Sequence, residues 1–136
     1  MNVSLVTIVT PELQALWGRA HKDVVAKRGG AALLKTLCGA IEEADLLANM
    51  VASSSLWSTD DEGQLMGFAV CRARVVEAVY VEHSFRRQKV ATTLVHALLA
   101  GETPPVDAYA LPGDRGMKSL YESLGWKARL LTMRGA

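Results

Sequence analysis

The stretch "VVEAVYVEHSFRRQKVATTLVHALLAG" limits the possible folds of this chain more than any other. Its valine-rich first part predicts a strand over 75–82. The part from Val90 to Ala100 predicts an amphipathic helix, because Leu94 and Leu98 lie four residues apart and Gly101 supplies a stop. A strand that leads into a helix through a short loop indicates a sheet with helices packed against it.

The loop between this strand and this helix carries three cations, Arg86, Arg87 and Lys89. A helix start bears a partial positive charge and unpaired N–H groups, so cations are locally unfavourable there. A bound anion such as a phosphate or pyrophosphate would remove that penalty. The alternative is a solvated basic loop with no ligand.

Composition favours one globular domain over residues 1–136, since half of the residues are hydrophobic and the net charge is only +1. The charge is uneven: residues 1–71 hold five Lys/Arg and eight Asp/Glu, whereas residues 72–136 hold ten and six. This imbalance suggests an anionic partner for the second half. A nucleic-acid-binding domain would use Arg72, Arg74, Arg86, Arg87 and Lys89, but the near-neutral charge argues against nucleic acid as a partner.

The sequence shows no pattern for a metal site or a Ser/His/Asp centre. The two cysteines, Cys38 and Cys71, are too far apart for a ligand pair. The first residues have no basic start or long apolar run, and no segment is long enough to cross a bilayer. We therefore expect a cytoplasmic protein that has no metal and no membrane partner.

The remaining segments predict a mixed α/β (α+β) fold in the order β, α, α, three strands, α, β, α, β. Thr10 and Pro11 form a good helix start. "TDDEG" reads as the turn of a hairpin. The predicted strands are 2–9, 51–58, 64–74, 75–82, 106–111 and 126–133, and the predicted helices are 11–28, 31–50 (with a break near Gly39), 90–100 and 114–125.

Two of these segments resemble motifs of the GNAT superfamily of N-acetyltransferases. In that family a strand ending in Val-x-Val is followed by Gln/Arg-x-x-Gly-x-Gly/Ala at a helix start. Here Arg86 takes the Gln/Arg place, Lys89 the middle glycine place and Ala91 the last small place. Downstream, "DRGMKSLYESLGW" resembles Asn-x-x-Ala-x-x-x-Tyr-x-x-x-Gly-Phe, with Asp114 in the asparagine place and Tyr121 in the tyrosine place.

The resemblance covers nearly the whole chain and implies a GNAT-like fold with a central, mixed, mostly antiparallel sheet. It also implies acetyl-CoA as co-substrate and an amine-bearing acceptor. Backbone groups of Tyr80–Glu82 would hold the pantetheine arm as an extra strand, and the amide of Val81 would meet the thioester carbonyl. The implied cofactor-binding residues are Tyr80, Val81, Glu82, Arg86, Arg87, Gln88, Lys89, Val90, Ala91, Thr92 and Asp114.

Two residues are candidates for catalysis. Tyr121 matches the tyrosine that protonates the departing thiolate in many family members; the alternative is an aromatic side chain that packs its helix. Glu77 lies on an otherwise apolar strand, near a position where some family members hold a glutamate base. The alternative for Glu77 is a solvent-facing position or an ion pair with Arg72 or Arg74.

The acceptor itself has no recognisable specificity motif. The acidic residues Glu42, Glu43 and Asp45 could attract a cationic amine or simply form an exposed helix face. A second hypothesis is a CoA-binding or regulatory module without turnover, because Lys89 and Asp114 depart from the motifs. Exposed strand edges also allow a homodimer.

Overall fold

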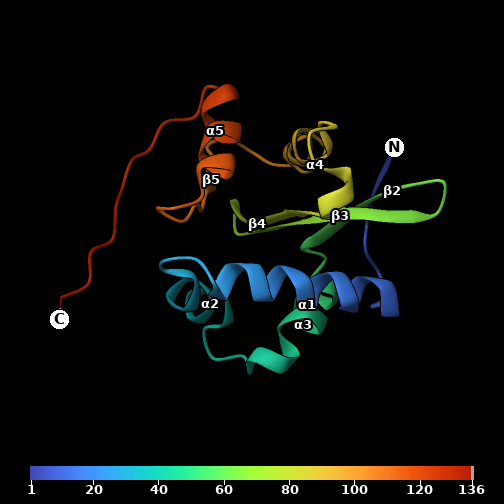
Figure 1. Cartoon of the computed structure of the whole chain (residues 1–136), viewed down its shortest axis with the longest axis horizontal. Helices are drawn as coiled ribbons and strands as arrows, with labels where there is room; N and C mark the ends of the chain where they lie inside the picture. The colour runs from blue at the N-terminus through green and yellow to red at the C-terminus, as the bar shows by residue number, and fades with distance from the viewer. Residues whose placement is uncertain (136) are drawn as a thin grey trace.

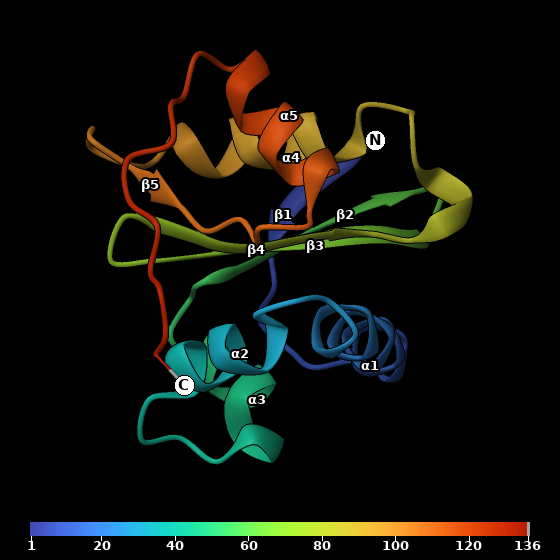
Figure 2. The same ribbon diagram turned by 60° about the vertical axis from the view of Figure 1, so that its left-hand side comes forward.

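A computed structural model describes residues 1–135 as three layers, with a sheet between two groups of helices. Helices α1 (Pro11–Val25), α2 (Gly30–Cys38) and α3 (Leu46–Ala52) cover one face of the sheet. Helices α4 (Val90–Leu99) and α5 (Arg115–Ser123) cover the other (Figures 1 and 2). Two short 3-10 turns, η1 (Glu43–Asp45) and η2 (His83–Phe85), complete the helical elements.

The sheet is mixed and mostly antiparallel, as predicted. Its spatial order is β1-β2-β3-β4-β5, which is also the order along the chain. The first four strands pair antiparallel and β5 runs parallel to β4. The strands are β1 (Asn2–Leu5), β2 (Leu56–Asp61), β3 (Gln64–Arg72), β4 (Val75–Val81) and β5 (Asp107–Ala108).

Each face of the sheet has its own apolar core. Phe68 and Val70 of β3 meet Leu16, Leu46 and Met50 from the helices on one face. Met66, Ala69 and Val81 meet Leu94 and Val95 of α4 on the other face. Residues of β3 therefore anchor both helical layers: Phe68 and Val70 face one and Ala69 the other, while the register shift against β2 places Met66 in the same core as Ala69. This explains why β3 is buried almost throughout.

Helix starts follow the predicted local chemistry. Thr10 caps α1, since its Oγ1 accepts a hydrogen bond of 3.1 Å from the backbone N–H of Leu13, and Pro11 occupies the first turn. The predicted second helical stretch does break at Gly39, but it divides into α2, η1 and α3. The strand predicted over 51–58 begins only at Leu56, because α3 continues to Ala52.

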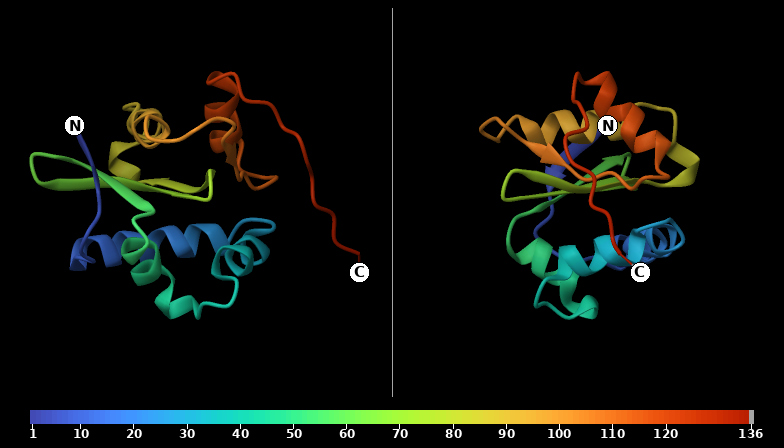
Figure 3. Two further views of the ribbon diagram at one scale, coloured as in Figure 1. Left: turned by 180° about the vertical axis from the view of Figure 1, so that it is seen from behind. Right: turned by 90° about the vertical axis from the view of Figure 1, so that its left-hand side faces the viewer.

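The prediction of a last strand over 126–133 is wrong. Gly125 turns the chain with a φ of 84°, and the Trp126 ring stacks on Tyr121. Residues 127–135 then run away from the sheet edge without pairing (Figures 1 and 3). Strand β5 is also only two residues long, so it offers too short an edge to hold another strand.

None of the helices in residues 1–135 is both long enough and apolar enough to span a bilayer.

Candidate active site

The most unusual feature of the sheet is that β4 loses its neighbour β5 halfway along. The register pairs Val75 with Asp107 and Val76 with Ala108 and then stops. The last bond is the 3.0 Å hydrogen bond from the N–H of Tyr109 to the carbonyl of Val76. From Glu77 to Val81, no strand of the described chain pairs with this edge of β4. We call this segment the open edge.

A bulge decides which backbone groups face the open edge. β3 pairs Val70 with Ala78 but Cys71 with Val76, so Glu77 is an extra residue on β4. Farther along, the N–H of Glu82 donates to the carbonyl of Met66 at 2.8 Å. Because backbone groups alternate along an antiparallel ladder, the N–H and C=O groups of Val79 and Val81 point away from β3 towards the open edge.

Arg86 closes the end of this edge. Its Nε donates to the Val81 carbonyl at 3.0 Å, its guanidinium lies 5.5 Å from the ring centre of Tyr80, and a terminal nitrogen is 3.6 Å from Asp23 Oδ2. Glu82 instead forms an ion pair with Arg19 of α1. One of the three predicted anion-binding cations is therefore committed to the protein itself.

The other two cations remain at the helix start. Arg87 and Lys89 are exposed, and neither forms an ion pair with another residue of the described chain. Both have left-handed backbones, with φ of 65° and 62°. Gln88 between them is exposed, Val90 is buried in the core, and Ala91 and Thr92 are half-buried. Lys89 thus keeps the backbone conformation that glycine adopts most easily.

We expect Lys89→Gly to raise the free energy of unfolding by about 1 kcal/mol, since a side chain at left-handed φ costs roughly that much. The contacts of Lys89 that cap α4 come from its carbonyl, which accepts from the N–H of Thr93 at 3.0 Å and from Thr93 Oγ1 at 2.8 Å, so glycine keeps them. Lys118→Gly in α5 is the matched control and should lower stability by about 1 kcal/mol. Urea unfolding measures both changes. A loss of stability in Lys89→Gly would contradict the left-handed backbone conformation at Lys89.

A hollow lies beside the open edge on the α1–α2 face. It offers about 100 Å³ of space that water-sized molecules can enter. Its floor is the open edge from Glu77 to Tyr80, and its opposite wall is the chain that follows β5, from Tyr109 to Leu111. Most of its other side chains are apolar, and come from α1, α2, α3, β3 and α5: Trp17, Ala20, Val24, Leu33, Leu34, Leu37, Leu46, Phe68 and Met117.

Glu77 and Asp114, two of the predicted site residues, face this hollow. Glu77 forms an ion pair with Arg72, which also donates to the Leu37 carbonyl at 2.6 Å. The ion-pair alternative considered for Glu77 is therefore the observed arrangement. Asp114 caps α5, because its Oδ1 accepts from the N–H of Met117 at 3.1 Å, and its Oδ2 lies 3.3 Å from Lys27 Nζ.

Tyr121 lies on the other side of the sheet and does not line the hollow. It packs among the α4-side core and stacks on Trp126, with ring centres 5.2 Å apart. Its hydroxyl is buried and has no hydrogen-bond partner among residues 1–135. Burial, and then the nearby carboxylate of Asp114, raise the pKa of this phenol. A buried hydroxyl without a partner is costly, so this one is a candidate to meet a bound group.

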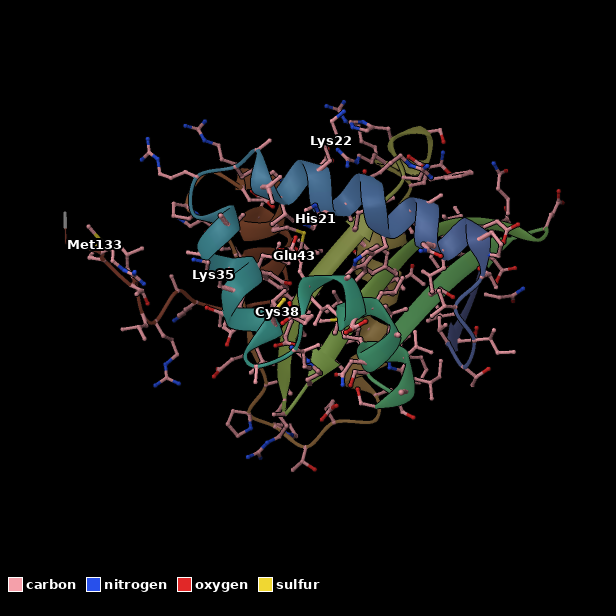
Figure 4. All side chains as sticks on the ribbon, turned by 90° about the horizontal axis from the view of Figure 1, so that it is seen from below. His21, Lys22, Lys35, Cys38, Glu43 and Met133 are labelled. Carbon is pink, nitrogen blue, oxygen red and sulfur yellow. The ribbon has the colours of Figure 1, made fainter. Side chains whose placement is uncertain are left out.

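Sequence reasoning missed several residues that build the hollow. Asp23 and Val24 come from α1, Lys27 from the turn that follows it, and Tyr109 follows β5. The signal for the α1 residues was a second stripe at helical spacing, in which Trp17, Ala20 and Val24 extend the core face. The far end of α1 is tied to η1 by His21, whose Nε2 contacts Glu43 (Figure 4).

Among residues 1–135 no group of three His, Cys, Asp or Glu side chains is placed to hold a metal ion. The site is therefore made of an unpaired strand edge, a basic helix start and an apolar hollow with paired carboxylates.

A mixed sheet whose β4 and β5 part halfway, followed by a basic helix start, defines the fold class of this chain, and its family is known from a family model. Residues 24–132 match the family model described as an acetyltransferase (GNAT) domain. Because the match covers most of the sequence, the chain belongs to the GNAT acetyltransferase family. No curated protein sequence matches the chain significantly.

Solved structures share the fold at low sequence identity. One is AAC(6')-Iy in complex with the bisubstrate analogue CoA-S-monomethyl-acetylneamine, with a TM-score of 0.56, 18% identity, and coverage of 87% of this chain and 92% of the other. Another is a ribosomal-protein-alanine N-acetyltransferase from Brucella melitensis biovar Abortus 2308, with a TM-score of 0.53, 18% identity, and coverage of 98% of this chain and 100% of the other. A third is apo-form YjaB from Escherichia coli, with a TM-score of 0.55, 18% identity, and coverage of 90% of this chain and 80% of the other.

Proposed function

We propose that this chain is an N-acetyltransferase that moves the acetyl group of acetyl-CoA to a primary amine by direct attack in a ternary complex. The open edge of β4 is the observation that supports this proposal most. It leaves backbone N–H and C=O groups unpaired beside a hollow, which is what an extended pantetheine arm needs in order to bind as an additional strand. In this proposal the arm pairs with the N–H and C=O of Val79 and with the N–H of Val81. The backbone groups of Tyr80 and Glu82, predicted for this role, face β3 instead, and the Val81 carbonyl accepts from Arg86.

The thioester carbonyl would meet the N–H of Val81, which the ladder register directs towards the open edge. The pyrophosphate would lie at the start of α4, against Arg87, Gln88, Lys89 and the amides of Val90, Ala91 and Thr92. The Arg86 guanidinium would hold the end of β4 in place through Val81. Asp114 would contact the cofactor from the cap of α5, where its carboxylate reaches the hollow.

Two proton-handling roles complete the proposal. The Tyr121 phenol would protonate the departing thiolate, because burial keeps the phenol protonated and its hydroxyl has no partner in the described chain. Glu77 would accept a proton from the ammonium form of the acceptor, since its carboxylate lies at the floor of the hollow. The ion pair with Arg72 fixes where that carboxylate points.

Calorimetric titration with acetyl-CoA and with S-acetyl-pantetheine tests the binding half of the proposal. We expect acetyl-CoA to bind with a dissociation constant in the micromolar range, and S-acetyl-pantetheine, which lacks the pyrophosphate, to bind about tenfold more weakly or worse. Equal binding of the two would remove the anion site at the start of α4. No binding of either would mean that the family relationship describes the fold alone.

Glu77→Gln should lower turnover and remove the fall in rate on the acidic side of the pH–rate profile, because the amide cannot accept the proton. Arg72→Met is the matched variant: it breaks the same ion pair but keeps the carboxylate, so the acidic fall should persist. Steady-state rates from pH 5 to pH 9 measure both. An unaltered profile in Glu77→Gln would show that the residue only supports the bulge.

The second candidate is a CoA-binding module without turnover. Lys89 at the glycine place and the pairing of Glu77 with Arg72 favour it. Tight binding of acetyl-CoA, with no acetylation of any amine and no effect of Tyr121→Phe, would identify this function.

A further inference from the structure

The walls of the hollow bear on which amine this site accepts. Side chains of Trp17 and Val24 on α1, Leu33 and Leu34 on α2, and Leu111 after β5 surround its space with apolar surface. A ligand that fills the hollow must therefore bury a body of its own against carbon atoms. Burial of apolar surface is favourable, whereas burial of an unpaired polar group is not.

The carboxylates in the hollow are already neutralised by the protein. Asp23 lies 3.6 Å from Arg86, Asp114 lies 3.3 Å from Lys27, and Glu77 is paired with Arg72. The hollow thus has no surplus of negative charge with which to receive several positive charges.

These two features together select against polycations. An acceptor with several ammonium groups would lose the hydration of each one and find no free carboxylate in return. An acceptor with one ammonium group needs only the reacting position, where loss of a proton to the base makes it neutral. The remainder of such a molecule can be apolar and match the walls.

We infer that the acceptor is a primary amine with a single positive charge on an aromatic or branched aliphatic body. This inference rests on the proposed function. The step is balanced: the amine nitrogen, after giving one proton to the base, forms a C–N bond to the acetyl carbon. The C–S bond breaks, the nitrogen gives up its second proton, and the sulfur takes one proton to become the CoA thiol. The products are an N-acetyl amide, the CoA thiol and one released proton.

The test compares three amines with acetyl-CoA, by release of free thiol: 2-phenylethylamine, ethylamine and spermidine. We expect kcat/KM for 2-phenylethylamine to exceed the values for the other two by about 10²-fold, because only this amine combines one charge with an apolar body. Calorimetry of 2-phenylethylamine with the CoA-loaded protein gives a second measurement that does not depend on turnover.

A variant pair connects the preference to the hollow. Leu34→Asp adds an unpaired carboxylate to the wall of the hollow. It should lower kcat/KM for 2-phenylethylamine and raise kcat/KM for spermidine. Leu131→Asp makes the same change on the exposed tail, at 66% exposure, and should change neither. If Leu34→Asp does not fold, the calorimetric binding of the unaltered protein decides.

The outcomes separate the inference from the proposed function. Preferential acetylation of spermidine would leave the acetyltransferase standing and overturn the inference. Binding of 2-phenylethylamine without acetylation of any amine would support the inference and count against turnover. Absence of both binding and acetylation of 2-phenylethylamine would overturn the inference, whereas failure of acetyl-CoA to bind in the earlier titration would overturn the proposed function.

Discussion

Tyr121→Phe should lower turnover by about 10²-fold while leaving the affinity for acetyl-CoA unchanged, because the variant removes only the proton that the thiolate would take. The same variant should be more stable than the unaltered protein by about 1 kcal/mol. Its hydroxyl is buried without a partner among residues 1–135, so folding leaves that group desolvated and unbonded. The stacking with Trp126 depends on the ring, which phenylalanine keeps.

Thr59→Val supplies the matched control. Thr59 Oγ1 is the other buried side-chain oxygen without a partner in the described chain, and it lies on β2, which does not line the hollow. This variant should also gain about 1 kcal/mol, but turnover should stay the same. Chemical unfolding and steady-state kinetics on both variants separate the two effects. A Tyr121→Phe variant that loses stability, or that keeps full turnover, would return Tyr121 to a packing role.

The central part of the fold could be predicted because local and tertiary preferences agree there. The predicted strand over 75–82 and helix over 90–100 correspond to β4 and α4 almost residue for residue. Both are apolar on the faces that the cores bury, so the pattern in the sequence is also the pattern of burial. The helix start at Thr10 and Pro11 has the same origin in short-range chemistry.

The ends of the sheet could not be predicted in this way. The segment over 126–133 has strand-like composition, yet strand formation needs a partner, and β5 presents only two paired residues. Leu130 and Leu131 therefore remain exposed. Composition shows that a segment can form a strand, whereas the formation of that strand also requires a sheet edge long enough to pair with it.

Only the part of the site that is local in sequence could be predicted. Family motifs located the strand end and the basic loop, which lie close together in sequence. The hollow joins α1, α2, β4 and the chain after β5, and no sequence spacing reports that meeting. The contacts of Arg86 with Asp23 and of Asp114 with Lys27 join residues 63 and 87 positions apart, so only the folded chain reveals them.

Gly67→Ala should destabilise the protein by about 3 kcal/mol and weaken acetyl-CoA binding as well. A Cβ at this position would lie 2.5 Å from the Tyr80 carbonyl oxygen and 3.2 Å from the Val81 Cα. Both are backbone atoms of the open edge, so they cannot rotate away as the end of a flexible side chain could. β4 must move instead, and such overpacking in a buried sheet costs a few kcal/mol.

Gly18→Ala is the control for the loss of glycine itself. No atom lies within 4 Å of a Cβ at Gly18, which is inside α1, so alanine should raise stability by about 0.5–1 kcal/mol. In thermal unfolding, the Tm of Gly18→Ala should lie above that of the unaltered protein and the Tm of Gly67→Ala should lie below it, by roughly 10 °C.

The binding measurement on Gly67→Ala carries the functional argument. If the backbone around Val81 holds the pantetheine arm, displacement of β4 must weaken acetyl-CoA even at temperatures where the variant is fully folded. Gly18→Ala should bind acetyl-CoA as the unaltered protein does. A folded Gly67→Ala variant with unchanged affinity would mean that the open edge is not where acetyl-CoA binds, because the same atoms cannot move and still offer the same hydrogen bonds.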